Sequence, residues 1–194
     1  MKKSRSAAVA VAARFTSHVY TAFPDSGLPH AAYIGMPLRS GITGLDRDAR
    51  RSDARHQFGL SPHLPTLLVS GGSQGARSIN TALVEARGDL LRNGVQILHV
   101  LGPKNFTDDM VAVYDDETGA SYRPVAYVSA MEDAYAAADL MLGRSGAGTV
   151  HETAVVGLPA VFVPLPHGNG EQARNADALV AAGGARIVPD AELD

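Results

Sequence analysis

The sequence contains no cysteine and no tryptophan, and aromatic residues make up only 6% of it. Without cysteine, disulfide bonds, thiolate metal sites and cysteine nucleophiles are excluded together. The apolar runs stay well short of the roughly 18 residues that a membrane-spanning helix needs. With 17 basic and 20 acidic residues the net charge is −3. This balance lacks the basic excess of a general nucleic-acid binder, so no nucleic-acid partner is expected.

The N-terminus imitates a secretory signal only in part. Basic residues come first, and an alanine- and valine-rich stretch follows them. That stretch is weakly apolar and Arg14 interrupts it, so the sequence does not predict a signal peptide. A cytoplasmic protein is therefore expected.

The chain has enough apolar material for one folded core. Its 194 residues are 45% hydrophobic and 19% charged, which is typical of about one globular domain. From residue 65 onward, short apolar runs alternate with helix-length segments, a pattern that predicts buried parallel strands in a doubly wound, Rossmann-like α/β sheet. The expected strands are 66–70, 95–100, 125–128, 139–142, 160–164 and 185–188. Helices are expected from the end of the first strand to about residue 91 and at 131–137, 149–156 and 171–182. A polar stretch of helical length follows residue 100.

Residues 1–64 differ from the rest and are interpreted as an edge or linker without a core of its own. Short strands are expected at 15–23 and 32–34, with a turn-rich stretch between them. The Arg- and Asp-rich segment after residue 39 is expected to be a connector that carries one short helix at 47–58.

The first glycine-rich cluster, residues 71–76 (GGSQGA), directly follows the expected strand 66–70 and opens a helix. Glycine allows a sharp turn and close approach of the backbone, and a helix N-terminus offers free N–H groups to an anion. The glycine spacing differs from the dinucleotide fingerprint, and no P-loop Gly-Lys-Ser/Thr follows. Two interpretations stay open: a phosphate-binding loop, or a tight turn with Ser73 as the helix cap.

The second cluster, residues 144–149 (RSGAGT), again joins an expected strand to an expected helix. Its backbone and hydroxyl groups are suited to a second part of the same anion. Glu152 follows Thr149 by three residues, which is the spacing of a capping box. The alternative is a carboxylate near a helix N-terminus that accepts two ribose hydroxyls. One side chain cannot fully serve both roles, so the two interpretations compete.

The third cluster, residues 164–172 (PLPHGNGEQ), begins where the expected strand 160–164 ends. Glu171, Gln172 and, just beyond, Asn175 are polar groups suited to a sugar with many hydroxyls. All three clusters follow parallel strands at their carboxyl ends, where such sheets bind ligands. Together they predict a nucleotide or nucleotide-sugar site.

Other candidate sites are weaker. The seven histidines show no His-x-x-x-His spacing, so no metal site is expected. Acidic residues at 108–109 and 115–117 lie in a polar stretch and are expected to be solvated rather than to hold a metal-bound diphosphate. No Gly-x-Ser-x-Gly nucleophile elbow occurs. His99 lies inside an expected strand and is predicted to be a core histidine rather than a base.

Longer phrases are more specific than any single cluster. LLVSGGSQGARSIN, AAADLMLGRSGAGTVHETAVVGLPAVFVPLPH and EQARNA resemble the C-terminal half of the MurG family, the peptidoglycan N-acetylglucosamine (GlcNAc) transferases. The resemblance extends upstream through AFPDSGLPHAAYIGMPLR and points to an actinobacterial member. It implies the GT-B glycosyltransferase fold. Residues 65–194 would be its nucleotide-sugar donor-binding C-terminal domain, truncated at the C-terminus, and residues 1–64 an N-terminal stub and interdomain linker.

The resemblance also implies roles for single residues. Ser73 matches a serine that contacts the donor diphosphate, and Arg39 matches an arginine near the donor. Val128 falls where a backbone group meets the uracil. Glu152 matches the ribose carboxylate and Gln172 a residue that reads GlcNAc hydroxyls, whereas Glu171 stands where some relatives carry another Gln. The implied donor-binding set is Arg39, Gly72, Ser73, Val128, Ser145, Gly146, Ala147, Gly148, Thr149, Glu152, Glu171 and Gln172.

The implied reaction is an inverting transfer of GlcNAc from UDP-GlcNAc to the C4 hydroxyl of lipid-linked muramoyl-pentapeptide (lipid I to lipid II), without metal or cofactor. The general base is expected in an N-terminal domain outside this chain, so no catalytic residue is assigned. The expected function is that of a donor-binding fragment of the transferase, inactive alone or completed by a partner chain. Full-length members are expected to be peripheral on the inner face of the plasma membrane. The alternative is a catalytically inactive UDP-sugar-binding module or half of a two-chain glycosyltransferase. A nicotinamide-dependent enzyme is disfavoured by the glycine spacing.

Overall fold

The computed structural model describes residues 7–23, 26–72, 76–166 and 170–193. The chain divides into two compact units, Met1–Arg39 and Ser40–Asp194. The first unit holds helix α1 (Ala7–Ala12) and a small parallel pair, β1 (Val19–Thr21) with β2 (Ala31–Tyr33). These two strands are shorter than the expected strands at 15–23 and 32–34.

The second unit is built on a seven-stranded sheet with the order β5-β6-β4-β3-β7-β8-β9. Every neighbouring pair is parallel except β5 with β6, which is antiparallel. The predicted doubly wound α/β fold is therefore confirmed, with one antiparallel edge strand in addition. The strands are β3 (Thr66–Ser70), β4 (Gln96–Val100), β5 (Val113–Tyr114), β6 (Ser121–Val125), β7 (Leu140–Gly143), β8 (Ala160–Phe162) and β9 (Ala185–Ile187).

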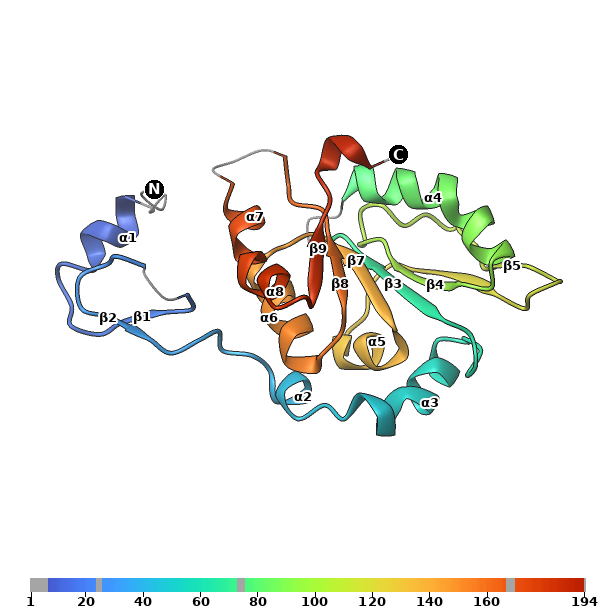
Figure 1. Cartoon of the computed structure of the whole chain (residues 1–194), viewed down its shortest axis with the longest axis horizontal. Helices are drawn as coiled ribbons and strands as arrows, with labels where there is room; N and C mark the ends of the chain where they lie inside the picture. The colour runs from blue at the N-terminus through green and yellow to red at the C-terminus, as the bar shows by residue number, and fades with distance from the viewer. Residues whose placement is uncertain (1–6, 24–25, 73–75, 167–169, 194) are drawn as a thin grey trace. The chain divides into compact units, whose positions relative to one another are not determined.

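Helices cover both faces of this sheet. Figure 1 shows α4 (Arg77–Arg92) on one side of the strands, and α3 (Arg47–Gln57) with α5 (Met131–Ala137) on the other. The remaining helices of the unit are α2 (Ser40–Thr43), α6 (Ala147–Val156), α7 (Glu171–Asn175), α8 (Asp177–Ala181) and the 3₁₀ turn η1 (Asp190–Glu192).

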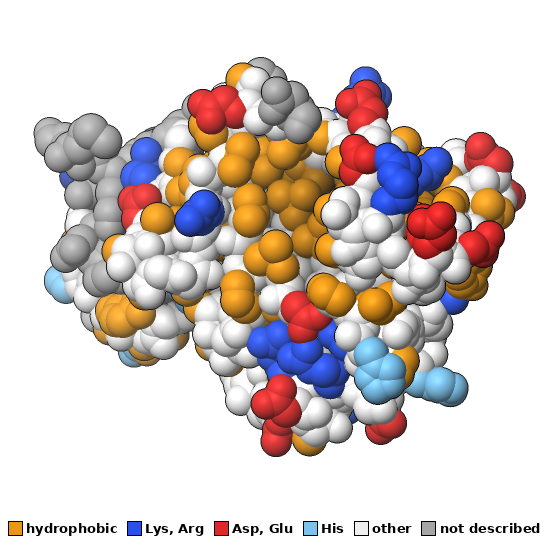
Figure 2. Space-filling view, turned by 45° about the vertical axis from the view of Figure 1, so that its right-hand side comes forward, with side chains coloured by type: hydrophobic (Ala, Val, Ile, Leu, Met, Phe, Trp, Pro, Cys, Tyr) orange, Lys and Arg blue, Asp and Glu red, His pale blue; other side chains and the backbone are white. Residues whose placement is uncertain are grey.

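The core lies against the central strands. Leu67 and Val69 of β3 pack with Ile79 and Leu83 of α4. Because side chains alternate along a strand, the fully buried Leu68 faces the opposite side of the sheet. Several apolar residues are only partly buried against the cluster under α4, namely Leu64, Leu90, Val95, Val113, Leu142, Val188 and Leu193. Figure 2 shows hydrophobic side chains gathered over a broad area of the face that it presents.

The structure corrects three expected elements. The strand expected at 125–128 lies at 121–125, because Tyr122 is the buried aromatic residue and Tyr127 is 69% exposed. The polar stretch after residue 100 forms turns and the short strand β5 instead of a helix. The helix expected at 171–182 is divided at Ala176 into α7 and α8.

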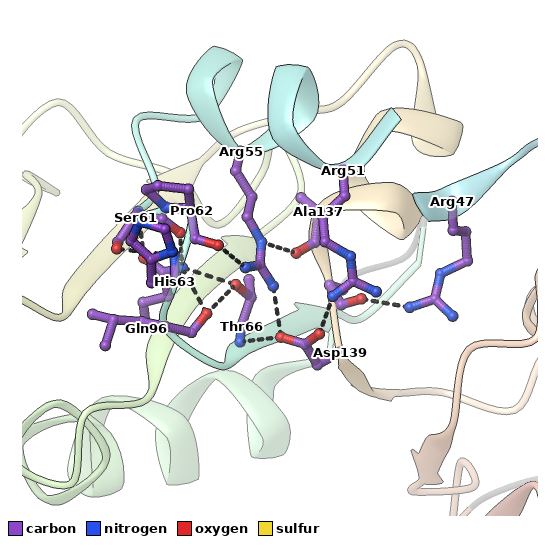
Figure 3. Close-up of polar contacts among 12 residues, drawn as sticks. Arg47, Arg51, Arg55, Ser61, Pro62, His63, Thr66, Gln96, Ala137 and Asp139 are labelled. Carbon is purple, nitrogen blue, oxygen red and sulfur yellow. Dashed lines mark hydrogen bonds and ion pairs between the residues drawn. The ribbon is translucent and has the colours of Figure 1, made fainter. Parts of the chain in front are cut away.

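Residues 40–64, which the sequence analysis assigned to the linker, lie in the second unit. Arg47, Arg51 and Arg55 are four residues apart on α3, so they share one face of the helix. Figure 3 shows all three reaching toward the segment that ends α5 and begins β7. Arg55 donates to Ala137 O at 3.0 Å and to Asp139 Oδ2 at 2.7 Å, and Arg51 forms an ion pair with Asp139. These contacts fasten α3 to the sheet.

Candidate functional site

The three glycine-rich loops follow adjacent strands. From β3 the chain adds β4 and β6 on one side of the sheet, and it then crosses over to add β7 on the other side of β3. The switch point of the sheet therefore lies between β3 and β7. Ligands of doubly wound sheets bind at the carboxyl ends of the strands beside this switch point. The residue pairs Ser70–Gly143 and Gly143–Phe162 align the ends of β3, β7 and β8. The strand ends that precede the three loops therefore lie side by side at one edge of the sheet, as predicted.

Gly143, at the end of β7, is required by packing. A Cβ atom at this position would lie 2.5 Å from the backbone oxygen of Ser70. This distance is far below van der Waals contact, so β3 and β7 approach this closely only with glycine here.

The N-terminus of α6 carries no side-chain cap. Gly146 is the N-cap residue, and Ala147, Gly148 and Thr149 form the first turn. Thr149 is thus inside the helix, so of the two interpretations of Glu152 that the sequence left open, the capping box with Thr149 is wrong. Among the residues that the structure describes, no atom lies within 4 Å of a Cβ built on Gly146 or Gly148. The described residues therefore leave space beside the first turn and no side-chain cap on it, so its backbone N–H groups are available to a ligand.

Two buried polar groups precede this helix. Ser145 is 0% exposed, and its Oγ has no hydrogen-bond partner among the described residues. Arg144 is 9% exposed and donates to the carbonyl oxygens of Val163, at 3.1 Å, and Pro164, at 3.2 Å. A buried hydroxyl that lacks a partner is uncommon in folded proteins and costs free energy unless a ligand or water satisfies it.

Arg144 also ties the loops to one another, a role that the sequence analysis missed. Its Nη2 donates to Ser78 Oγ at 2.9 Å, in the first turn of α4, and its Nη1 pairs with Asp190 of η1. Ser78 Oγ in turn donates to Asp190 Oδ1 at 2.7 Å. One guanidinium thus connects the segments that follow β3, β7 and β8. The only sequence signal was an arginine in a glycine-rich loop directly after an apolar strand.

Glu152 lies on α6 and is partly buried. Its Oε2 accepts a hydrogen bond of 2.7 Å from the hydroxyl of Tyr135 on α5. The carboxylate is therefore held in place by a side chain rather than by the helix N-terminus. Tyr135 was not singled out in the sequence, because no spacing pattern links it to Glu152.

The first loop is described in part. Gly72 has φ of +71°, a left-handed conformation that favours glycine, and no atom lies within 4 Å of a Cβ built on it. Ser73 lies outside the described residues, and so does its expected contact with a diphosphate. The N-cap of α4 is Ala76, which makes no side-chain cap. Like α6, α4 begins at this edge of the sheet, and no described side chain caps its first backbone N–H groups.

The third loop leads into α7. Gln172 Oε1 accepts a hydrogen bond of 3.0 Å from Leu165 N within the same loop, so its amide oxygen is engaged by the backbone. Glu171 is exposed in the first turn of α7. Asn175 donates from Nδ2 to Ser145 O at 3.0 Å and so connects α7 to the second loop. Asn175 and Ser145 are thus brought together, as the sequence predicted for their loops.

Two predicted residues do not belong to the three loops. Val128 follows β6, at the start of the connection that crosses to β7, and is 7% exposed. Arg39 is the last residue of the first unit and is described apart from the second.

The weaker candidates are accounted for by local structure. His99 is 0% exposed and lies within hydrogen-bonding distance of Tyr122 Oη, at 3.0 Å, and Asn80 Oδ1, at 3.1 Å. The prediction of a core histidine is confirmed. Asp115 accepts from the backbone N–H and the hydroxyl of Thr118 in a turn, and these hydrogen bonds lower its pKa. Within the described part of the chain, no three acidic or histidine side chains are grouped as metal ligands would be.

An open cavity of about 440 Å³ adjoins α2, α3 and α5. Its lining includes Ser40, Asp46, Arg50, Asp53 and Glu132 and none of the predicted site residues.

The described ranges contain no helix that is long and apolar enough to cross a membrane.

Sequence comparisons identify similar proteins. The family model of the glycosyltransferase family 28 C-terminal domain matches residues 66–194. The UDP-N-acetylglucosamine–N-acetylmuramyl-(pentapeptide) pyrophosphoryl-undecaprenol N-acetylglucosamine transferase of Cutibacterium acnes is 59% identical over 190 residues, 95% of this chain and 51% of that protein. The enzyme of the same name from Saccharopolyspora erythraea is 57% identical over 183 residues, 94% of this chain and 48% of that protein. The chain thus spans about half the length of these relatives.

Structural comparisons agree with the sequence comparisons. The crystal structure of Acinetobacter baumannii MurG matches with a TM-score of 0.63 and 25% identity, over 94% of this chain and 56% of that one. The calicheamicin glycosyltransferase CalG4 matches with a TM-score of 0.54 and 20% identity, over 85% of this chain and 37% of that one. The second likeness shows the fold alone.

Proposed function

Because the chain belongs to the glycosyltransferase family 28 C-terminal domain family, we propose that it binds UDP-GlcNAc as the donor half of a peptidoglycan GlcNAc-transferase. In this proposal the UDP moiety lies at the carboxyl edge of β3, β7 and β8. The acceptor is the lipid-linked muramoyl-pentapeptide, in keeping with the name of the Cutibacterium acnes relative.

The observation that carries the proposal is the uncapped N-terminus of α6. N–H groups without a side-chain cap, space beside Gly146 and Gly148, and the Ser145 hydroxyl lie together at the switch point. These donors have no acceptor among the described residues, and a diphosphate supplies acceptor oxygens. The helix dipole favours the negative charge that UDP gains as it leaves.

The other residues then take roles along the donor. Glu152 accepts ribose hydroxyls, the backbone at Val128 meets the uracil, and Gln172 with Glu171 faces the GlcNAc. To contact the sugar through its amide oxygen, Gln172 has to give up the hydrogen bond that Oε1 accepts from Leu165 N and accept one from a sugar hydroxyl instead. Gly72 and Ser73 complete the diphosphate contacts, and Arg39 lies near the donor. No metal is needed in this proposal, because the backbone N–H groups and the helix dipole stabilise the phosphate charge.

The transfer step needs residues that this chain does not supply. We propose that the general base and the acceptor-binding surface come from a second domain or partner chain, peripheral on the inner face of the plasma membrane. The acceptor C4 hydroxyl then attacks the anomeric carbon, its proton passes to that base, and the bond to UDP breaks with inversion.

Isothermal titration of the chain with UDP-GlcNAc, UDP and ADP tests donor binding. We expect UDP and UDP-GlcNAc to bind and ADP to bind at least about tenfold more weakly, since a pocket built for uracil excludes the larger purine. Heat changes absent at millimolar UDP would overturn the proposal. Tight binding of NADH without competition from UDP would redirect it to a nicotinamide enzyme.

Glu152→Ala separates the ribose role from a purely structural one. We expect it to weaken UDP binding about tenfold and to leave the binding of pyrophosphate, which has no ribose, unchanged. Equal weakening of both ligands would show that Glu152 only supports the loop. Glu117→Ala, a change in the polar segment before β6, serves as the matched control and should alter neither affinity.

A further inference from the structure

The hydrogen bond between Tyr135 and Glu152 joins two helices, α5 and α6. Tyr135 is 1% exposed, so its ring is enclosed by protein. Its hydroxyl donates to Glu152 Oε2 at 2.7 Å, while the Glu152 side chain remains only partly buried. A carboxylate has two oxygen atoms, and fixing one of them sets the direction in which the other, Oε1, accepts hydrogen bonds.

A second contact holds the same two helices at a fixed spacing. Arg47 Nε donates to Tyr135 O at 3.2 Å, and Arg47 Nη1 donates to Gly157 O at 2.9 Å. Gly157 is the C-cap residue of α6, so the guanidinium bridges the C-terminal ends of α5 and α6. The Tyr135 hydroxyl is thereby presented to α6 at a constant position along the helix.

We propose that Tyr135 is a positioning residue that gives the donor site its preference for ribose, by orienting Glu152 so that Oε1 accepts a ribose hydroxyl. This inference rests on the proposed function, because it requires a nucleoside diphosphate in the site. An acceptor held in the binding orientation loses less side-chain entropy when the ligand arrives than a freely rotating one does. The charge on the carboxylate strengthens the hydrogen bond that it then accepts.

The experiment compares two ligands that differ only in the ribose hydroxyls, UDP and 2′,3′-dideoxyuridine diphosphate. Their affinities are measured by calorimetry for the wild-type chain and for Tyr135→Phe, Glu152→Ala and the double variant. Tyr135→Phe keeps the buried ring and removes only the hydroxyl. Tyr114→Phe, at an exposed tyrosine on β5, is the matched control.

We expect Tyr135→Phe to weaken UDP about tenfold and to leave the dideoxy ligand within about twofold of wild type. The double variant should bind UDP no more weakly than Glu152→Ala alone, because the two residues act through one contact. Tyr114→Phe should change neither affinity.

Two results overturn the inference while the proposed function stands. One is equal weakening of both ligands by Tyr135→Phe, which shows a structural role only. The other is a Tyr135→Phe variant that binds UDP and the dideoxy ligand with the affinities of the wild-type chain. A wild-type chain that binds neither ligand instead defeats the proposed function itself, and the inference falls with it.

Discussion

Two glycines at the carboxyl edge of the sheet, Gly143 and Gly146, differ in what the surrounding protein requires at their positions. Gly143 is required because a Cβ would collide with Ser70 O at 2.5 Å. Gly146 has φ of −61° and ψ of 148°, which any residue adopts, and no atom of the described residues lies within 4 Å of its Cβ position. The described part of the protein gives no reason for glycine at 146. A ligand that approaches the backbone there does, since a side chain would fill its space.

Gly146→Ala is therefore expected to fold and to bind the donor poorly. The stability loss should stay within about 1 kcal/mol, the difference between glycine and alanine at an N-cap. The affinity for UDP-GlcNAc should fall at least about tenfold, because an added methyl in a filled site costs on the order of 1–3 kcal/mol. Thermal unfolding and calorimetry measure the two effects separately.

Gly88→Ala is the control for that substitution. Gly88 lies within α4, where the only close contact of an added Cβ is Arg92 Nη1, at the end of a flexible side chain. Alanine should stabilise the helix by about 0.5–1 kcal/mol and leave donor affinity unchanged. Wild-type affinity in Gly146→Ala would show that the ligand does not approach this backbone.

His99 links the core to pH. Burial lowers its pKa from 6.5 to about 4, because the charged imidazolium would lose its hydration inside the sheet. Below pH 6.5 the unfolded chain binds a proton at His99 that the folded chain excludes until about pH 4. The contribution of the neutral, buried His99 to the free energy of unfolding is therefore fully present above pH 6.5, and it is lost as the pH falls from 6.5 to about 4.

From pH 7 to pH 4 this histidine should cost about 3 kcal/mol of unfolding free energy. Urea titrations across this range measure the loss for wild type and for His99→Gln, whose neutral amide does not titrate. The His99→Gln profile should be flatter by that amount, whatever its stability at pH 7. The exposed His63→Gln should run parallel to wild type, and a parallel His99→Gln profile would contradict the assignment.

At the scale of elements, α3 is held by buried arginine contacts rather than by an apolar face. Arg55 is 4% exposed and bonds to Ala137 O, Pro62 O and Asp139 Oδ2. Asp139 also accepts from Thr66 N at 2.8 Å, at the start of β3. The guanidinium thus replaces hydration for several backbone oxygens at once, and its loss leaves them without a donor.

Arg55→Ala should lower the free energy of unfolding by about 2–3 kcal/mol, since it breaks a largely buried charge pair. Arg92→Ala removes an exposed ion pair with Asp89 and should cost less than about 0.5 kcal/mol. Urea unfolding of the two variants measures both changes. Similar small losses would mean that water readily replaces the Arg55 contacts.

The elements predictable from the sequence were those whose signal is local. Strand 66–70 was predicted with its observed bounds because all five residues are buried and read as one continuous run. The position of β6 along the chain was predicted wrongly, because Tyr122 is buried beside His99 on a neighbouring strand and no local pattern indicates this contact. The capping box failed because α6 begins two residues before Thr149. Arg144 and Tyr135 act on partners that only the tertiary fold brings close.

At the scale of the whole molecule, the chain carries a seven-stranded sheet but spans about half the length of its curated relatives. In the proposed function, donor binding relies mainly on the loops at one edge of that sheet. Transfer also needs a base and a surface that holds the acceptor hydroxyl in line with the anomeric carbon, because proximity and orientation supply a large part of catalysis. A chain that binds the donor but lacks the base and the acceptor surface would therefore bind UDP-GlcNAc without transferring the sugar.

We therefore expect no GlcNAc transfer from UDP-GlcNAc to a lipid-linked muramoyl acceptor by this chain alone. Transfer should appear when the remaining half of the Cutibacterium acnes relative is supplied as a separate chain, because in the proposed function that half would supply the base and the acceptor surface. Radiolabelled product formation measures it, and Glu152→Ala in the mixture should reduce it through weaker donor binding. Donor binding without transfer in the mixture would favour the alternative, a UDP-sugar-binding module without catalysis. Transfer by the chain alone would place the base within its own residues.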